Sequence, residues 1–212
     1  MKKKTVILDY GMGNLFSVLN AIKYLNFPVE ISNNPSEILK ADSIILPGVG
    51  SFKKAMSSLN NNGFIDVLKE SVLEKQKNIL GICLGMQLFA SAGEEDGFSK
   101  GLGFIDGRVK RMIMPDNEKL KLPHIGFNTV SFDKKSILGN HIDNNSDFYF
   151  VHSYHLFHKE VNLIEAKCEY GIKFTAAYEK DNIFATQFHP EKSQTNGLQL
   201  LKNFLEIWVS AK

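Results

Sequence analysis

The stretch Asn78-Ile79-Leu80-Gly81-Ile82-Cys83-Leu84-Gly85 decides the fold of this 212-residue chain. Its first five residues form a short apolar run typical of a buried strand, and residues 84–92 are predicted to form a helix. Glycines lie two residues before and after Cys83, the pattern of a G-x-S-x-G nucleophile elbow with cysteine in place of serine. Glycine suits such a turn because the chain bends sharply with no room for Cβ atoms. The stretch therefore predicts a nucleophile where a strand ends and a helix begins.

Other segments of the chain predict a sheet around this turn. Earlier apolar runs predict strands, and amphipathic runs between them predict helices: strands at 5–8, 28–31 and 43–46, and helices at 14–24, 51–60 and 63–76. Such alternation indicates a parallel sheet covered on both faces. After residue 102 the pattern changes to strands joined by polar turns, followed by a final helix: strands at 108–113, 129–132, 148–151, 174–178 and 183–186, and a helix at 196–209. We predict one α/β domain over residues 1–212, with a mostly parallel central sheet flanked by helices and antiparallel strand additions in the second half.

Composition excludes several classes of protein. The net charge is only +2, and two of the 25 basic residues are arginines, which argues against a nucleic-acid binder. The apolar run after the N-terminal lysines stops at Asp9, too soon for a signal peptide, and no run approaches a membrane span. Two cysteines cannot form a framework of several disulfides. We expect a cytoplasmic protein with reduced thiols and no membrane or nucleic-acid partner.

A cysteine nucleophile needs a base and a group that orients the base, and the second half of the chain supplies both. In Gln187-Phe188-His189-Pro190-Glu191, an extended backbone would project His189 and Glu191 to the same side. His189 would then take the thiol proton while Glu191 holds the imidazole. A lone cysteine is more often a buried structural residue, but the flanking glycines argue against that interpretation here.

A glycine-rich loop, Pro47-Gly48-Val49-Gly50, follows the strand at 43–46. We assign an oxyanion-stabilising role to the backbone at Val49 and Gly50, together with the N–H of Leu84. By itself the loop would be better interpreted as a simple turn. A dinucleotide site after the first strand is rejected because Phe16 occupies the third glycine position of the fingerprint. Histidine spacing suggests no metal site, and we expect no cofactor.

Together, the motifs resemble the class I glutamine amidotransferases, and more closely the HisH family, the glutaminase subunits of imidazole glycerol phosphate synthase. The resemblance covers nearly the whole chain and rests on these blocks in order: Asp9 to Leu15, Leu46 to Gly50, Gly81 to Gln87, Pro123 to Gly126, Phe150 to Tyr154 and His189 to Ser193. It implies a flavodoxin-like glutamine amidotransferase fold. It also implies hydrolysis of L-glutamine by a Cys83, His189 and Glu191 triad.

The resemblance further implies roles outside the triad. Gln87 and Glu95 would bind glutamine, with Glu95 facing its α-ammonium group, and the backbone at Ser153 and Tyr154 would hold its α-carboxylate. A second set would face a partner subunit: Asn14, Tyr149, Lys192, Pro123, Phe127 and Asn128. Phe127 stands where the family usually has tryptophan, and Phe16 where it usually has a polar residue.

The implied partner is a (β/α)₈ cyclase that forms a heterodimer with this chain and receives ammonia through a channel in histidine biosynthesis. Three alternatives remain open at the level of sequence. A paralogue could supply ammonia for surface-sugar amidination, a free-standing cysteine hydrolase could use the same elbow, and a non-catalytic subunit could retain the fold. Gln87, Glu95 and the short chain weigh against the hydrolase, and the complete triad weighs against the non-catalytic subunit.

Overall fold

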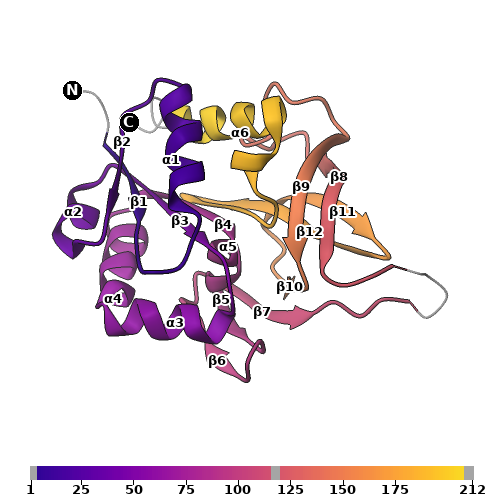
Figure 1. Cartoon of the computed structure of the whole chain (residues 1–212), viewed down its shortest axis with the longest axis horizontal. Coiled ribbons are helices and arrows are strands. Elements are labelled where there is room, and N and C mark those ends of the chain that lie inside the picture. Colours follow the sequence, from indigo (N-terminus) through magenta and orange to yellow (C-terminus); the bar gives the residue numbers. More distant parts are fainter. Residues whose placement is uncertain (1–3, 116–119, 208–212) are drawn as a thin grey trace.

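A nine-stranded mixed sheet forms the centre of the protein (Figure 1), whose structure is a computed structural model that describes residues 4–115 and 120–207. Five neighbouring strands run parallel, in the order β2 (Val29–Ser32), β1 (Thr5–Leu8), β3 (Ser43–Gly48), β4 (Asn78–Cys83) and β13 (Ile183–Thr186). The sheet continues with antiparallel pairings through β12 (Ile172–Lys180), β11 (Ile164–Tyr170), β8 (His124–Phe132) and β9 (Ser146–His152). The predicted α/β class and antiparallel additions are confirmed, and the antiparallel part is as extensive as the parallel part.

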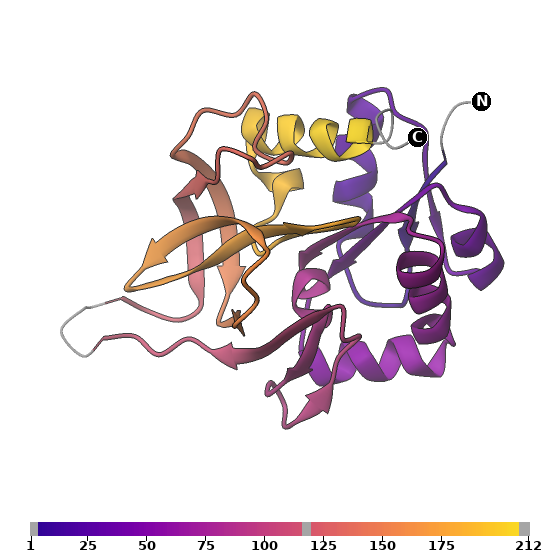
Figure 2. The same ribbon diagram turned by 180° about the vertical axis from the view of Figure 1, so that it is seen from behind.

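Apolar side chains alternate between the two faces of the parallel strands. In β1, for example, Val6 and Leu8 pack in one core while Ile7 packs in the other. Two helices cover the Ile7 face: α1 (Leu15–Tyr24) and α6 (Gln194–Glu206) (Figures 1 and 2). The opposite face is covered by α2 (Pro35–Lys40), α3 (Phe52–Asn61), α4 (Phe64–Lys69) with its π-helical continuation Glu70–Glu74, and α5 (Leu84–Leu88). Burial on both faces explains why these strands are continuous apolar runs.

A second, four-stranded sheet packs against the core on the α3 side. Its order is β10 (Tyr154–His158), β7 (Ile105–Arg111), β5 (Ala90–Gly93) and β6 (Ser99–Lys100). The helix predicted for residues 84–92 is therefore wrong beyond Leu88, because Ala90 to Gly93 pair with β7 instead. That pairing partner is distant in sequence, so local periodicity gave no sign of it.

Other predicted elements differ mainly at their ends. The strand predicted at 183–186 matches β13, and the last helix begins at Gln194, two residues earlier than predicted. Residues 208 and 209 of that prediction lie outside the described residues. Within the described ranges, no helix is both long enough and apolar enough to cross a bilayer.

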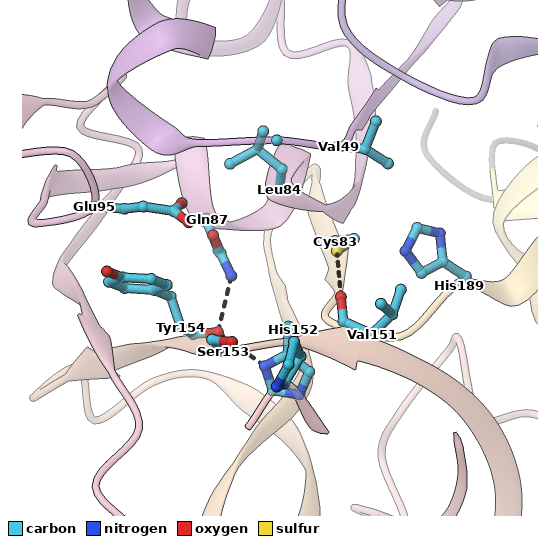
Figure 3. A pocket seen from close by; sticks show the side chains of 12 residues that line it. Val49, Cys83, Leu84, Gln87, Glu95, Val151, His152, Ser153, Tyr154 and His189 are labelled. Carbon is cyan, nitrogen blue, oxygen red and sulfur yellow. Dashed lines mark hydrogen bonds between the residues drawn. The ribbon is translucent and has the colours of Figure 1, made fainter. Parts of the chain in front are cut away.

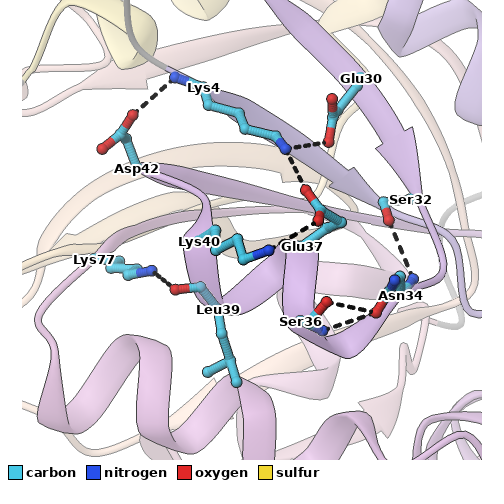
Figure 4. A network of polar contacts seen from close by, with 10 residues as sticks. All are labelled: Lys4, Glu30, Ser32, Asn34, Ser36, Glu37, Leu39, Lys40, Asp42 and Lys77. Carbon is cyan, nitrogen blue, oxygen red and sulfur yellow. Dashed lines mark hydrogen bonds and ion pairs between the residues drawn. The ribbon is translucent and has the colours of Figure 1, made fainter.

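Charged side chains join the first strands at the edge of the sheet where β1 begins (Figure 4). The Lys4 ammonium contacts Glu30 of β2 at 2.8 Å and also pairs with Glu37 of α2. Hydrogen bonds to these carboxylates raise the pKa of Lys4, and the one from Lys4 lowers the pKa of Glu37. This cluster ties β1, β2 and α2 together at the amino ends of the strands, opposite the carboxyl ends where the predicted nucleophile lies.

Candidate active site

Cys83 lies at a sharp turn between β4 and α5. It is the last residue of the strand, and its backbone has φ 54° and ψ −108°, a conformation that L-residues rarely adopt. A Cβ atom on Gly85 would lie 1.8 Å from the carbonyl oxygen of Leu46, so α5 contacts β3 at a distance that only glycine permits. The glycines thus let α5 begin directly beside the thiol. Cys83 as a whole residue is 7% exposed.

His189 and Glu191 form a buried pair just after β13. The Nδ1 atom of His189 lies 2.8 Å from Oε1 of Glu191, and the two side chains are 3% and 1% exposed. His189 has the expected extended backbone, but Glu191 lies in a 3₁₀ turn over Pro190–Lys192 instead of continuing the strand. Alternation along an extended chain was therefore the wrong reason for their proximity, because Pro190 starts the turn that brings the carboxylate back to the ring.

The electrostatics of His189 favour its charged form. Burial by itself would lower its pKa, but interactions with Cys83 and Glu191 outweigh burial and raise the pKa of His189 to about 10. The Nε2 atom is buried and makes no hydrogen bond to any other described residue. In Figure 3 the ring lies on the same side of the site as the Cys83 sulfur. The imidazole thus has one nitrogen fixed by a carboxylate and the other free for chemistry.

A cavity of about 250 Å³ opens beside the thiol (Figure 3). Its wall contains these residues: Val49, Gly50, Cys83, Leu84, Gln87, Glu95, Pro123, Val151, His152, Ser153, Tyr154 and His189. The structure thus gathers the predicted nucleophile, base, oxyanion and glutamine-binding residues around one space, while Glu191 lies behind His189. Pro123 was predicted to face a partner but also contributes to the cavity wall. Val151 and His152 also line the cavity, although the sequence motifs assign them no role there.

The predicted oxyanion residues lie next to the thiol because β3 and β4 are in register. Gly48 pairs with Cys83, so Val49 and Gly50 leave the sheet beside the elbow. Gly50 has φ +105°, and a Cβ atom there would lie 2.8 Å from Cε of Met12. Leu84 is the first residue of α5, so its N–H has no acceptor within the helix. The backbone here can offer donors to an anion forming beside Cys83.

The predicted glutamine-binding residues occupy the other end of the cavity. The Gln87 side chain donates to the carbonyl of Tyr154 at 3.0 Å. Glu95 accepts from the N–H of Phe52 at 3.1 Å, and burial raises its pKa despite this hydrogen bond. The carbonyl of Ser153 accepts from Met112 at 2.9 Å, which fixes the β9–β10 connection. An acidic group and an ordered backbone segment therefore lie at the end of the cavity away from His189.

The residues predicted to face a partner divide into two groups. Tyr149 contacts Phe127, with ring centroids 5.5 Å apart, and the Lys192 ammonium lies 5.7 Å from the centre of the Tyr149 ring. Phe127 is 47% exposed, and Phe16 on α1 is 71% exposed. Asn14 precedes α1, which packs beside the turn containing Lys192.

Asn128, in contrast, faces inward. Its Nδ2 lies 2.6 Å from Nε2 of His124, and Nδ1 of that ring lies 3.0 Å from Nε2 of His152. Burial lowers the pKa of His124 to about 4 and that of His152 to about 3, so both rings are neutral at pH 7. His152 in turn contacts the Tyr154 carbonyl at 2.8 Å. Asn128 thus supports the cavity wall from behind.

Gln187 is a further buried residue near the thiol, and the sequence motifs assign it no role. Its Nε2 lies 3.7 Å from the Cys83 sulfur. Its position two residues before His189 was the only available signal, and that position alone does not show where the side chain points. Among the described residues, no three His, Cys, Asp or Glu side chains gather as they would around a metal ion.

Comparison with known proteins agrees with this geometry. The family described as glutamine amidotransferase class-I matches residues 6–208. Imidazole glycerol phosphate synthase subunit HisH 1 of Campylobacter jejuni strain RM1221 is 51% identical over 95% of this chain and 98% of its own length. The HisH subunit of Acinetobacter baylyi is 46% identical over 96% of this chain and 98% of its own length.

Solved structures show the same fold at low identity. A glutamine amidotransferase crystal structure matches with a TM-score of 0.74 at 17% identity, over 95% of this chain and 97% of that one. PurLQS from Thermotoga maritima matches with a TM-score of 0.74 at 14% identity, over 97% and 98%. The chain therefore belongs to the class I glutamine amidotransferases, in the family of the HisH subunits of imidazole glycerol phosphate synthase.

Proposed function

We propose that this chain hydrolyses L-glutamine to glutamate and ammonia through Cys83, His189 and Glu191, and delivers the ammonia to a (β/α)₈ cyclase in histidine biosynthesis. The observation that carries the proposal is the cavity of about 250 Å³ with a cysteine at a strand–helix turn in its wall, beside an imidazole held by a buried carboxylate. The whole chain, residues 1–212, acts as one glutaminase domain in the cytoplasm.

The first half of the reaction is attack on the side-chain amide of glutamine. The Cys83 thiolate bonds to the amide carbon, and the carbonyl electron pair moves to oxygen. The backbone N–H groups of Val49, Gly50 and Leu84 stabilise that oxyanion. When the tetrahedral intermediate collapses, protonated His189 gives its proton to the leaving nitrogen, which departs as ammonia. The raised pKa of His189 supports this role because it keeps the imidazolium populated at neutral pH.

The second half releases glutamate. A water molecule attacks the glutamyl thioester while His189 accepts its proton, and the cysteine sulfur leaves. Glu191 holds Nδ1 of the ring throughout, so Nε2 is the nitrogen that exchanges protons. Glu95 and the backbone at Ser153 and Tyr154 hold the two charged groups of the amino acid at the opposite end of the cavity.

A partner is required by the chemistry of the product. Ammonia released into neutral water is mostly protonated and loses its nucleophilicity, so productive transfer needs an enclosed path to the acceptor. The exposed side chains of Phe16 and Phe127 support docking of the cyclase on a surface that includes them, with Tyr149 packed against Phe127 and the Lys192 ammonium near the Tyr149 ring. Such a face would be covered in a heterodimer.

The same surface favours a second candidate for the partner that accepts the ammonia. Phe16 and Phe127 are exposed at two positions where the sequence departs from the usual residues of the family. A partner of different surface chemistry, such as a synthase that amidinates a surface sugar, would fit such a change. The glutaminase chemistry would be unchanged, because neither Phe16 nor Phe127 lines the cavity beside the thiol.

Glutamate release by the purified chain tests the proposal, alone and with the cyclase plus its ribulosyl phosphate substrate. We expect low activity alone, a large rise with the cyclase and substrate, and no activity from Cys83→Ala in either condition. Cys168→Ala is the matched control, because Cys168 is buried and burial raises its pKa to about 12.

Two results would redirect the assignment. An unchanged rate with the cyclase, while Cys83 still turns over glutamine, would exclude the histidine-pathway partner and favour the sugar-amidinating one. Full activity without any partner would instead identify a free-standing hydrolase.

A further inference from the structure

Gln187 is a fully buried amide that contacts the Cys83 sulfur. It follows β13, its backbone N–H donates to the carbonyl of Ala176 at 2.7 Å, and the residue has no exposed surface. Its side-chain Nε2 lies 3.7 Å from Sγ of Cys83, and its Oε1 accepts from Nε2 of Gln87 at 3.0 Å. The triad accounts for none of these contacts, yet they fix a polar side chain against the nucleophile.

The surrounding groups determine which end of the Gln187 amide faces the sulfur. The Tyr154 carbonyl can only accept, so the Gln87 group 3.0 Å from it must be its NH₂. That same NH₂ also contacts Gln187, which must therefore present its oxygen there. The NH₂ of Gln187 consequently points toward Cys83. A single backbone acceptor thus fixes the orientation of both side-chain amides.

The sulfur lies between two groups that favour opposite protonation states. The carbonyl of Val151, 4.0 Å from Sγ, can accept only from the thiol S–H. The NH₂ of Gln187 can donate to the thiolate, and hydrogen bonding to a charged form favours that form. The Gln187 contact is buried, where a fixed donor interacts more strongly with a charge than it would in water, whereas the Val151 contact is only partly buried.

We infer that Gln187 is a fixed hydrogen-bond donor to the Cys83 sulfur, oriented by Gln87, and that it stabilises the thiolate before glutamine is attacked. Its consequence for catalysis rests on the proposed function, but the contact itself does not. If Gln187 only filled space, replacing it by an apolar side chain of the same length would leave the reactivity of the thiol unchanged.

The test is the pH profile of Cys83 alkylation by iodoacetamide in the purified chain, followed by mass spectrometry of the peptide that contains it. Gln187→Met keeps the length of the side chain and removes the donor. We expect the midpoint of the profile to rise by about one pH unit, with alkylation about tenfold slower below the midpoint. Gln199→Met is the matched control, because the Gln199 side chain on α6 donates to Asn203 at 2.8 Å and does not line the cavity.

Glutaminase kinetics with the partner distinguish a failure of the Gln187 inference from a failure of the proposed function. Gln187→Met is expected to lower kcat about tenfold with little change in KM, because the thiolate is needed for chemistry and not for binding. A shifted alkylation profile in a chain without glutaminase activity would support the contact and contradict the proposed function. An unshifted profile in folded Gln187→Met would overturn the inference, whatever the glutaminase activity.

A second measurement covers the case in which the variant does not fold. In the ¹⁵N-labelled wild-type chain, the side-chain NH₂ of Gln187 should shift with the same pH midpoint as alkylation, and this transition should be absent in Cys83→Ser. A Gln187 signal that is insensitive to thiolate formation in the wild-type chain would overturn the inference without any variant of Gln187.

Discussion

Replacement of Glu191 by glutamine tests the geometry of the site most directly. The carboxylate lies 2.8 Å from Nδ1 of His189, and the side chains are 1% and 3% exposed, so water cannot take its place. The neutral amide no longer stabilises the imidazolium, and its NH₂ can face Nδ1 and favour the wrong tautomer. Loss of an orienting carboxylate in such triads lowers kcat by about 1,000- to 10,000-fold, or roughly 4–5.5 kcal/mol of barrier.

The assay is glutamate release with the partner present, with kcat and KM measured separately. We expect KM to change by less than about threefold, because Glu191 does not line the cavity. Glu206→Gln is the matched control, since Glu206 lies on the exposed surface of α6 with a Lys202 contact of 4.0 Å. A folded Glu191→Gln variant that retains kcat within about threefold of wild type would refute the assigned role of this pair.

Three further predictions concern binding, packing and pH. Glu95→Gln should raise KM for glutamine about tenfold with little change in kcat, because it removes the charge that we propose binds the α-ammonium group. An unchanged KM in steady-state kinetics would contradict this. Gly85→Ala should lower the free energy of unfolding, measured in urea, by at least about 3 kcal/mol, because the added Cβ would lie 1.8 Å from the Leu46 carbonyl oxygen. A variant as stable as wild type would contradict that close contact. Glu165→Gln should cost roughly 1–2 kcal/mol at pH 7. Although burial opposes it, hydrogen bonding from His158, Lys167 and Thr175 lowers the pKa of Glu165 to about 2. The stabilisation is therefore present above pH 4.5 and is lost as pH falls through about 2, so unfolding at pH 7 and pH 2 should show the difference disappear.

The chemistry of the site could be predicted from local sequence because its requirements are local. A cysteine between two glycines, placed after an apolar run, specifies a strand–helix turn whatever surrounds it. The position of His189 after a strand indicates its role, but the position of Glu191 two residues later indicates an extended chain. The structure has a 3₁₀ turn there, since Pro190 fits the first position of a helical turn as well as an extended segment.

The second sheet could not be predicted as a sheet, although the strand predicted at 108–113 overlaps β7, because the pairings of β7 with β5 and β10 join segments that are not adjacent in sequence. Ala90 to Gly93 continue an amphipathic pattern from α5, and they form a strand because they pair with Ile105 to Arg111 on one side and with Ser99 and Lys100 on the other. The same limit applies to the contact between Asn128 and the buried ring of His124, which no local pattern indicates. Strand pairing and side-chain direction depend on tertiary contacts that residue types alone do not specify.

Sequence by itself determined the α/β class, the strand–turn–helix at Cys83 and the residue types of the candidate site, because each follows from periodicity, glycine placement or a contiguous motif. Only the tertiary structure decided which of these residues share one cavity and which atoms touch. The register of β3 with β4 brings Val49 and Gly50 beside the thiol, and the pairing of β13 with β4 brings Gln187 and His189 to the same edge. Residues more than a hundred positions apart meet there because parallel strands end together, a consequence of the sheet that no local stretch contains.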